Sequence, residues 1–257
     1  MKIVSWNVNS IRSRAEFVGQ FLDEESPDIL CVQELKNTGE NIPEDLFSGR
    51  GYETAVYGQK RWNGVLIASK LPMTAVERGF PGEEGGDARM IKATVGGVEL
   101  VNLYCPQGQS ADSPKFGYKK RFYGHLIEWA RARVASGGSW VFTGDFNIAP
   151  DDCDVWDTEV WKGVPTFHPD EHALWEELLG CGLRDAGRPF IPDGAFTFWD
   201  YRMGRFFRNQ GMRIDHFLVS QELDGRVVSS KVHRDWRKKR KELKASDHAP
   251  VELELRD

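Results

Sequence analysis

The chain has 257 residues, of which 40% are hydrophobic and 28% charged, and its formal net charge is −5. This balance is typical of a globular protein and argues against a non-specific coat on nucleic acid, although a local basic patch would suffice for a nuclease. No apolar run is long enough to span a membrane, and the chain opens directly on a strand-like run without a signal peptide. We therefore expect a cytoplasmic protein with no membrane partner.

Ten apolar and β-branched runs predict strands, because turn-forming residues separate them. They cover residues 2–8, 28–34, 53–58, 64–69, 89–95, 98–104, 139–145, 213–220, 226–233 and 250–255. Three stretches with helical spacing of apolar residues cover residues 13–25, 116–135 and 170–181. Gly96–Gly97 predicts a hairpin. Several strands follow one another without a helix, and ten strands approach the limit of an open sheet. The pattern therefore favours an α/β protein with two mixed sheets flanked by helices.

Several of these runs end in an acid, an amide or a histidine. In the clearest case, a buried strand runs into Gly144, then Asp145, with Asn147 two residues further on. Residues two apart on a strand point the same way, so we expect Asp145 and Asn147 to share one face. The pattern recurs at Asn7, Gln33–Glu34, Asp215 and Asp247–His248. Burying single charges is costly, so we expect these ends to meet around a cation.

The ligand atoms at these ends predict a hard cation. Glu34, Asp145, Asp247 and Asn7 offer only oxygens, and Asn9 is a further candidate. Such ligands suit Mg²⁺ or Mn²⁺, whereas zinc favours clustered histidines or cysteines. Since Mg²⁺ commonly combines one or two carboxylates with substrate phosphate oxygens, the set predicts metal-dependent hydrolysis of a phosphate ester.

One histidine is expected to join this chemistry. His248 follows Asp247, and Asp215 is a plausible distant partner. A carboxylate behind an imidazole fixes its tautomer and favours its charged form, so a cationic His248 could hold a phosphoryl oxygen. His216 should point to the opposite face of its sheet and lie in the core.

Two further segments each admit two interpretations. Residues 190–212 interleave aromatic rings with arginines, which is typical either of a binding loop or of a cap on the core. Residues 233–241 form a basic run just before the Asp-His pair. This run either contacts backbone phosphates or is a solvated hairpin tip.

The ordered set of motifs closely resembles the exonuclease III and apurinic/apyrimidinic endonuclease family, in its bacterial exonuclease III branch. The motifs span the chain in family order: Ser5–Asn9, Gln33–Glu34, Tyr104–Gly108, Gly144–Asn147, Met212–Asp215 and Ser246–Pro250. The resemblance implies one endonuclease/exonuclease/phosphatase domain over residues 1–257, with the DNase I-like four-layer sandwich. It also implies Mg²⁺-dependent cleavage of duplex DNA 5′ to abasic sites, leaving a 3′-hydroxyl. Exonuclease activity in the 3′→5′ direction and cleaning of 3′ ends are implied as well, with Mn²⁺ as a substitute metal.

Carried over by position, the resemblance assigns roles around the metal. It implies that Glu34 is the principal metal ligand, helped by Asn7 and Asp247. Asp145 would orient or deprotonate the attacking water. Tyr104 would sit at the phosphate as a donor or, if ionised, as an alternative activator.

The resemblance also assigns the contacts to DNA. It implies that Asn147 and His248 bind the scissile phosphate, with Asp215 behind His248. The other implied substrate contacts are Gln107, Lys115, Arg89, Phe198, Trp199, Asn209, Met212 and Ile214. Four of them, Phe198, Trp199, Met212 and Ile214, would wall a pocket for a flipped-out abasic sugar. Many relatives have tryptophan in place of Met212, and the smaller methionine predicts tolerance of altered sugars or 3′ ends.

Other functions share this fold and metal chemistry. A phosphatase or phosphodiesterase acting on phosphoinositides would need membrane-facing apolar loops, whereas these loops are aromatic and basic. A secreted nuclease would normally carry a signal peptide and paired cysteines. A DNA-binding protein without catalysis is the third alternative. A monomer that rides along duplex DNA, and so associates with the nucleoid, is the expected state.

Overall fold

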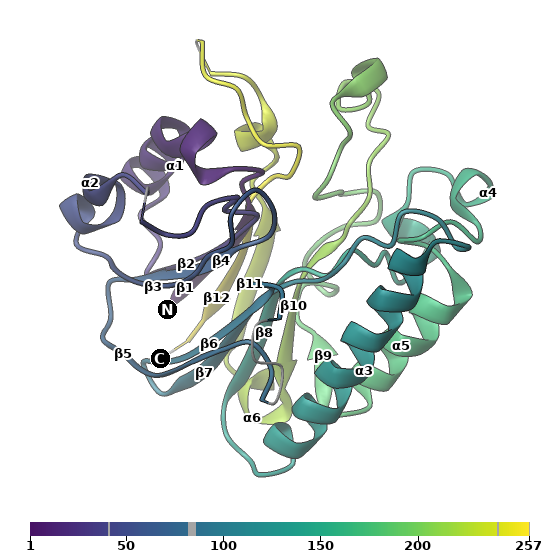
Figure 1. Cartoon of the computed structure of the whole chain (residues 1–257), viewed down its shortest axis with the longest axis horizontal. Helices are drawn as coiled ribbons and strands as arrows, with labels where there is room; N and C mark the ends of the chain where they lie inside the picture. Colours follow the sequence, from purple (N-terminus) through teal and green to yellow (C-terminus); the bar gives the residue numbers. More distant parts are fainter. Residues whose placement is uncertain (41, 82–85, 241, 257) are drawn as a thin grey trace.

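The computed structural model describes residues 1–40, 42–81, 86–240 and 242–256 (Figure 1). Within these residues the strands form two six-stranded mixed sheets. The first has the order β11 (Val227–Val232), β12 (Val251–Leu255), β1 (Lys2–Asn7), β2 (Ile29–Gln33), β4 (Val65–Ser69) and β3 (Glu53–Tyr57). The second has the order β5 (Met73–Arg78), β6 (Met90–Val95), β7 (Val98–Tyr104), β8 (Trp140–Asp145), β10 (Asp215–Ser220) and β9 (Leu183–Asp185).

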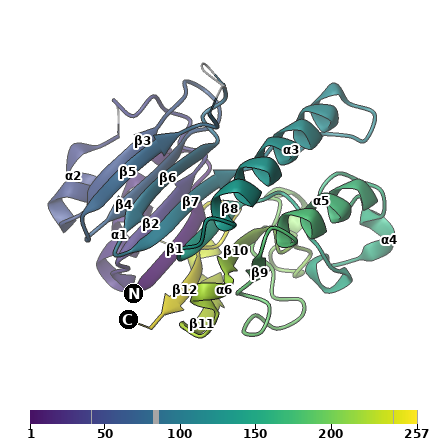
Figure 2. The same ribbon diagram turned by 90° about the horizontal axis from the view of Figure 1, so that it is seen from below.

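The two sheets pack face to face and helices cover both outer faces, as Figures 1 and 2 show. An apolar cluster that includes Ile3, Ile67 and Phe217 lies between the sheets, and the buried amides of Gln33 and Asn102 form a hydrogen bond across the same space. Helix α1 (Ile11–Glu25) packs Phe17 and Phe21 against the first sheet. Helices α3 (Pro114–Val134) and α5 (Pro169–Leu179) cover the second. The predicted four-layer α/β sandwich is therefore confirmed.

The ten predicted strands are all present, with ends that differ by at most two residues. The Gly96–Gly97 hairpin is confirmed, since Val95 pairs with Val98 and both glycines have positive φ. Strands β5 and β9 were not predicted. β5 has no fully buried residue, and β9 is only three residues long, so neither leaves a clear apolar pattern. The remaining short helices are α2 (Glu44–Phe47), η1 (Ser48–Arg50), η2 (Asp152–Asp154), α4 (Thr158–Trp161), η3 (Arg202–Gly204), α6 (Gln221–Asp224) and η4 (Arg234–Arg237).

Strand direction places the polar residues at one edge of the sandwich. β1 and β2 are parallel and end at this edge, as does β8 in the other sheet. β12 and β10 run antiparallel to β1 and β8, and therefore begin where those strands end. Asp215, which opens β10, pairs in register with Asp145. The predicted strand end at Asp215 is thus corrected, because Asp215 opens β10, whereas His248 precedes β12 as the strand predicted over residues 250–255 implies.

No helix in the described part of the chain is long and apolar enough to cross a membrane. All four cysteines, Cys31, Cys105, Cys153 and Cys181, are free thiols.

Candidate active site

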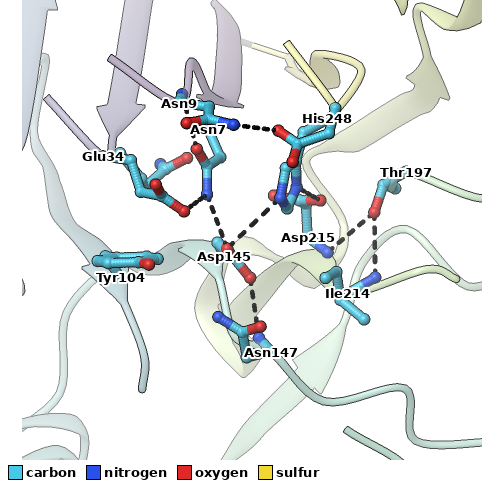
Figure 3. A network of polar contacts seen from close by, with 12 residues as sticks. Asn7, Asn9, Glu34, Tyr104, Asp145, Asn147, Thr197, Ile214, Asp215 and His248 are labelled. Atoms are coloured by element: carbon cyan, nitrogen blue, oxygen red, sulfur yellow. Dashed lines mark hydrogen bonds and ion pairs between the residues drawn. The ribbon is translucent and has the colours of Figure 1, made fainter. Parts of the chain in front are cut away.

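Asn7 links the two sheets at the polar edge (Figure 3). Its side-chain amide donates to Glu34 Oε1 at 3.0 Å and to Asp145 Oδ2 at 2.8 Å. Asn7 ends β1, Glu34 follows β2, and Asp145 ends β8, so a single amide joins residues from both sheets. The strand-end residues that the sequence singled out are therefore brought together. Hereafter we call Asn7, Glu34, Asp145, Asp215, Asp247 and His248 the polar centre.

His248 lies between two buried carboxylates. Its Nδ1 donates to Asp215 Oδ2 at 2.8 Å, and its Nε2 lies 3.8 Å from Asp145 Oδ2. Burial alone would lower the pKa of His248, but the charges of Asp215 and Asp145 outweigh it and raise the pKa to about 10. Burial also raises the pKa of Asp145, to about 7, although His248 opposes the rise. The imidazole is therefore a cation at neutral pH, with its Nδ1 proton donated to Asp215 and its Nε2–H facing Asp145.

Asn147 reaches the centre by a turn, not by strand alternation. β8 ends at Asp145, and the backbone N–H of Asn147 donates to Asp145 Oδ1 at 3.0 Å. The Asn147 amide donates to the carbonyl of Cys105 at 2.9 Å. Gly144 precedes the turn with φ +138°, and a Cβ there would collide with the carbonyl of Leu103. The predicted proximity of Asp145 and Asn147 is right, but an Asx-type turn produces it.

Left-handed backbone conformations cluster at this edge. Glu34, Asn147 and Asn9 have φ values of +54°, +52° and +47°. Such conformations cost of order 1 kcal/mol or more for residues other than glycine and concentrate at functional sites. Hydrogen bonds from Ser10 N to the Glu34 carbonyl and from Asn9 N to Asn7 Oδ1 help to hold the loops in place.

The oxygen donors fit a hard cation. Glu34 Oε2 contacts the ammonium of Lys36 at 2.8 Å, which shows that a positive charge is stable at this position. Lys36 also donates to Asn9 Oδ1, and Asn9 donates to Asp247 Oδ1 at 3.0 Å. Asn9 thus spans the gap between the two acids that the sequence assigned as ligands.

A second set of possible ligands overlaps the first. Asp145, Asp215 and His248 present ligand atoms within 4.8 Å of one another. The charged His248 already pairs with both carboxylates of this set, through Nδ1 with Asp215 and through Nε2 with Asp145. We therefore favour Glu34, Asp247 and Asn7 as the residues that could hold a metal, because their carboxylate and amide oxygens suit a hard ion.

Tyr104 is held in its protonated form in this arrangement. It lies beside Glu34 and Asp145 in Figure 3. Burial and the negative charges of Glu34 and Asp145 raise the pKa of its hydroxyl well above its usual value. This favours the donor role for Tyr104 over the ionised activator.

A polar cavity of about 450 Å³ flanks the polar centre on the Glu34 side. It brings together three predicted substrate contacts, Arg89, Gln107 and Lys115. The guanidinium of Arg89 lies 4.9 Å from the Tyr104 ring and donates to the Tyr104 carbonyl. Sequence reasoning missed Trp62, which lines the same cavity with 68% of its surface exposed. A lone tryptophan in a polar loop was the signal that could have identified it.

An apolar wall flanks the centre on the His248 side. The Phe198 ring lies 4.9 Å from the His248 ring and packs with Met212 and Ile214, as predicted. Trp199 is not part of this wall, which corrects its assignment to the sugar pocket. It is fully buried and packs against Phe206 on the other side of the loop, because neighbouring residues in extended chain point in opposite directions.

Asn209 is likewise separated from the wall. Its side-chain oxygen accepts a hydrogen bond from the Trp199 indole at 3.3 Å, and its amide donates to the Gly194 carbonyl. In this structure Asn209 therefore supports the loop that carries Trp199. It contacts Trp199 but is not brought together with the predicted substrate contacts of the polar cavity or of the apolar wall.

The aromatic loop caps the core in part, and its role as a binding loop stays a prediction. Phe196, Trp199 and Phe206 are buried and cap the core, whereas Phe207 is 89% exposed. The basic run is not a uniformly solvated tip, because Trp236 and Arg237 are buried. Lys238 and Lys239 are exposed, and Lys241 lies outside the described residues.

Comparison with known proteins places the chain in a family. Residues 4–248 match the model of the endonuclease/exonuclease/phosphatase family. Exodeoxyribonuclease III of Haemophilus influenzae is 33% identical over 270 residues, covering 100% of both chains. The structure of a 3′-5′ exonuclease from Neisseria meningitidis superposes with a TM-score of 0.95 at 39% identity, covering 100% of both chains. An AP endonuclease from Archaeoglobus fulgidus gives a TM-score of 0.93 at 34% identity, covering 99% of both. The chain belongs to the endonuclease/exonuclease/phosphatase family.

Proposed function

We propose that this protein is a Mg²⁺-dependent DNA repair nuclease. It hydrolyses the phosphodiester 5′ to an abasic site in duplex DNA and leaves a 3′-hydroxyl. It also removes nucleotides from 3′ ends and cleans blocked 3′ ends. The observation that carries this proposal is the polar centre, in which Asn7 joins Glu34 to Asp145 and His248 joins Asp145 to Asp215. The full-length similarity to enzymes named exodeoxyribonuclease III and AP endonuclease supports it.

Glu34, Asp247 and Asn7 would hold the Mg²⁺ ion, and Mn²⁺ would substitute because it has similar ligand preferences. When bound, such an ion neutralises charge on a phosphoryl group and on the leaving oxygen. The ammonium of Lys36 contacts Glu34 Oε2, so this ion pair would compete with a metal for Glu34.

The remaining residues of the centre act on the phosphate and the water. His248, charged between Asp215 and Asp145, would donate to a phosphoryl oxygen. Asp145, once ionised, would orient or deprotonate the attacking water. Asn147 would bind the scissile phosphate from its position beside Asp145. Tyr104 would donate its hydroxyl proton in a hydrogen bond to the same group.

These contributions have different sizes. Hydrolysis of this class needs roughly 20 kcal/mol of barrier reduction. A general base supplies only about 10²–10⁴-fold in rate. Most of the reduction must therefore come from charge stabilisation and positioning, which explains the concentration of polar groups at one edge.

The two flanks would hold the DNA. Arg89, Gln107 and Lys115 would contact the strand through the polar cavity, and Phe198, Met212 and Ile214 would accept an extruded abasic sugar. We propose that the enzyme works as a monomer that rides along the duplex.

The test is a labelled duplex with one synthetic abasic site, incubated with Mg²⁺ or EDTA beside an intact duplex with a recessed 3′ end. We expect a single Mg²⁺-dependent cut at the abasic site and a slower ladder from the recessed end. Failure to cut either substrate would refute the proposal. Binding without cutting would then indicate an inactive DNA-binding protein, and absence of both would direct the assay to phosphoinositides.

A further inference from the structure

Arg237 is a buried cation without a carboxylate partner. It is 8% exposed, and among the described residues no acid forms an ion pair with it. Its guanidinium lies 4.9 Å from the Tyr201 ring and 5.2 Å from the Phe206 ring. Nη2 donates to the Trp199 carbonyl at 3.0 Å, while Nε has no partner. Burial of an unpaired charge is costly, so this guanidinium has unused capacity for an anion.

Arg14 presents a second guanidinium of the same kind. It comes from α1, donates to the Asn9 carbonyl and donates to the Tyr201 hydroxyl at 3.0 Å. Its Nε is also buried without a partner, and no acid of the described residues forms an ion pair with it. The Tyr201 hydroxyl in turn donates to the Ala245 carbonyl at 3.0 Å. Segments far apart in the sequence thus place Arg14 and Arg237 on either side of Tyr201.

The two arginines line one open cavity of about 470 Å³. Tyr201, Lys239, Lys244 and Ala245 complete its described lining, which contains no acidic side chain. The acids nearest to Arg237 are engaged elsewhere: Asp200 pairs with Arg202, and Asp247 accepts from Asn9. Among the described residues, Lys239 forms an ion pair with the exposed Glu242, at 3.5 Å. The cavity is therefore positive on every side that the structure describes.

We propose that this cavity binds a phosphate group, supplied by the backbone of the DNA strand next to the reacting position. Guanidinium groups suit phosphate because their donors match its oxygens in pairs. The cavity adjoins the polar centre, since Arg14 donates to the carbonyl of Asn9 and Asn9 donates to Asp247. This choice of source rests on the proposed function. Free inorganic phosphate shares the same chemistry and is the second source.

The test measures binding of an uncut abasic duplex in EDTA over a salt series, by fluorescence anisotropy. Each lost phosphate contact reduces the slope of log K against log[salt] by about 0.9. We expect that reduction, with weaker binding, for Arg14→Gln and for Lys244→Gln. Lys244 is exposed, so its replacement tests the cavity without disturbing the packing around Tyr201. Arg131→Gln is the matched control, because Arg131 lies on the outer helix α3 and pairs only loosely with Glu177.

A second arm titrates inorganic phosphate into the wild type and the variants, with binding followed by calorimetry and thermal unfolding. Saturable phosphate binding that Arg14→Gln abolishes, with an unchanged DNA slope, would assign the cavity to free phosphate. Unchanged slopes together with no phosphate binding would overturn the proposal. Cleavage with Mg²⁺, measured in parallel, separates the proposed function from the proposed phosphate site. If the wild type cuts the abasic duplex but the variants have unchanged slopes, the proposed function stands and the phosphate site is refuted. If the wild type does not cut but the variants show the reduced slope, the phosphate site stands and the proposed function is refuted.

Discussion

Two buried clusters of charged residues in this molecule differ in their balance of carboxylates and cations. The polar centre contains four carboxylates and the cationic His248, and Lys36 outside it pairs with Glu34. The second cluster, which we call the arginine network, consists of Arg213, Asp154, Asp185, Arg188 and His216. Arg213 Nε lies 2.7 Å from Asp154, and its Nη2 lies 2.7 Å from Asp185. Its buried carboxylates are therefore matched by guanidinium groups.

The pKa values reflect this difference. Burial raises the pKa values of Asp154 and Asp185, but Arg213 outweighs it, and both lie below the usual value. Burial raises the pKa of Asp145 to about 7, because no guanidinium compensates it. A cluster that neutralises its own charge stabilises the scaffold, whereas a cluster with surplus carboxylates requires a cation from outside.

A second group of possible metal ligands, Asp151, Cys153 and Asp154, lies at the arginine network. Arg188 already contacts all three of these residues.

The strongest test of the comparison removes one carboxylate from the polar centre. We expect Asp145→Asn to lower the rate of cleavage at an abasic site by about 10³-fold or more, equivalent to ~4 kcal/mol of barrier. Stability should change little, because an amide replaces a carboxylate whose ionisation is disfavoured. Single-turnover cleavage and urea unfolding measure the two effects. Retention of full activity would remove Asp145 from the mechanism.

The second test breaks the arginine network. Arg213→Met removes the guanidinium that pairs with both Asp154 and Asp185 and leaves Asp154 with Arg188, and breaking such a buried pair costs about 3–5 kcal/mol. Urea unfolding should show this loss in the free energy of unfolding. The cleavage rate per folded molecule should stay near that of the wild type. A loss below about 1 kcal/mol in the free energy of unfolding would be close to that of an ordinary surface substitution. It would contradict the role of Arg213 in stabilising the fold.

A third test uses pH. His216 packs between Phe146 and Trp175, and its Nε2 donates to the Ile148 carbonyl. Burial, assisted by Arg213, lowers its pKa from 6.5 to about 4. Between these values the unfolded chain binds a proton that the folded chain does not, so stability falls as the pH decreases. His216 contributes about 3 kcal/mol to this loss across the window, measured as the difference between the wild type and the His216→Gln variant, because the raised pKa of Asp145 acts in the opposite direction. His216→Gln should abolish it, and an equal loss in the variant would exclude His216 as its cause.

The smallest expected effect is stabilisation by metal. A ligand at 100 times its dissociation constant stabilises the folded state by about 2.7 kcal/mol. Mg²⁺ should therefore raise the midpoint of thermal unfolding of the wild type, and Glu34→Gln should remove most of the rise. Asp151→Asn, in the region of the arginine network, is the control and should keep it. If Asp151→Asn removed the rise and Glu34→Gln kept it, the ion would bind at the arginine network and not at the polar centre.

The sequence predicted those site residues that stand next to a recognisable pattern in the chain. Asp145 and Glu34 stand directly beside apolar runs, so pattern alone identified them. Trp199 was misassigned because a run of aromatic residues does not reveal which ring faces inward. Lys119 and Glu171 form a fully buried ion pair between α3 and α5, yet each belongs to an ordinary helical pattern. The contact of Arg14 with Tyr201 joins residues 187 apart, which only the folded chain brings together.

The most direct measurement is an anomalous difference map from a crystal of the protein soaked in Mn²⁺. We expect a peak between Glu34 and Asp247, close to Asn7, with Lys36 displaced from Glu34. A peak only at Asp151 and Asp154, or only between Asp145 and Asp215, would contradict the claim that surplus carboxylates at the strand ends form the catalytic metal site.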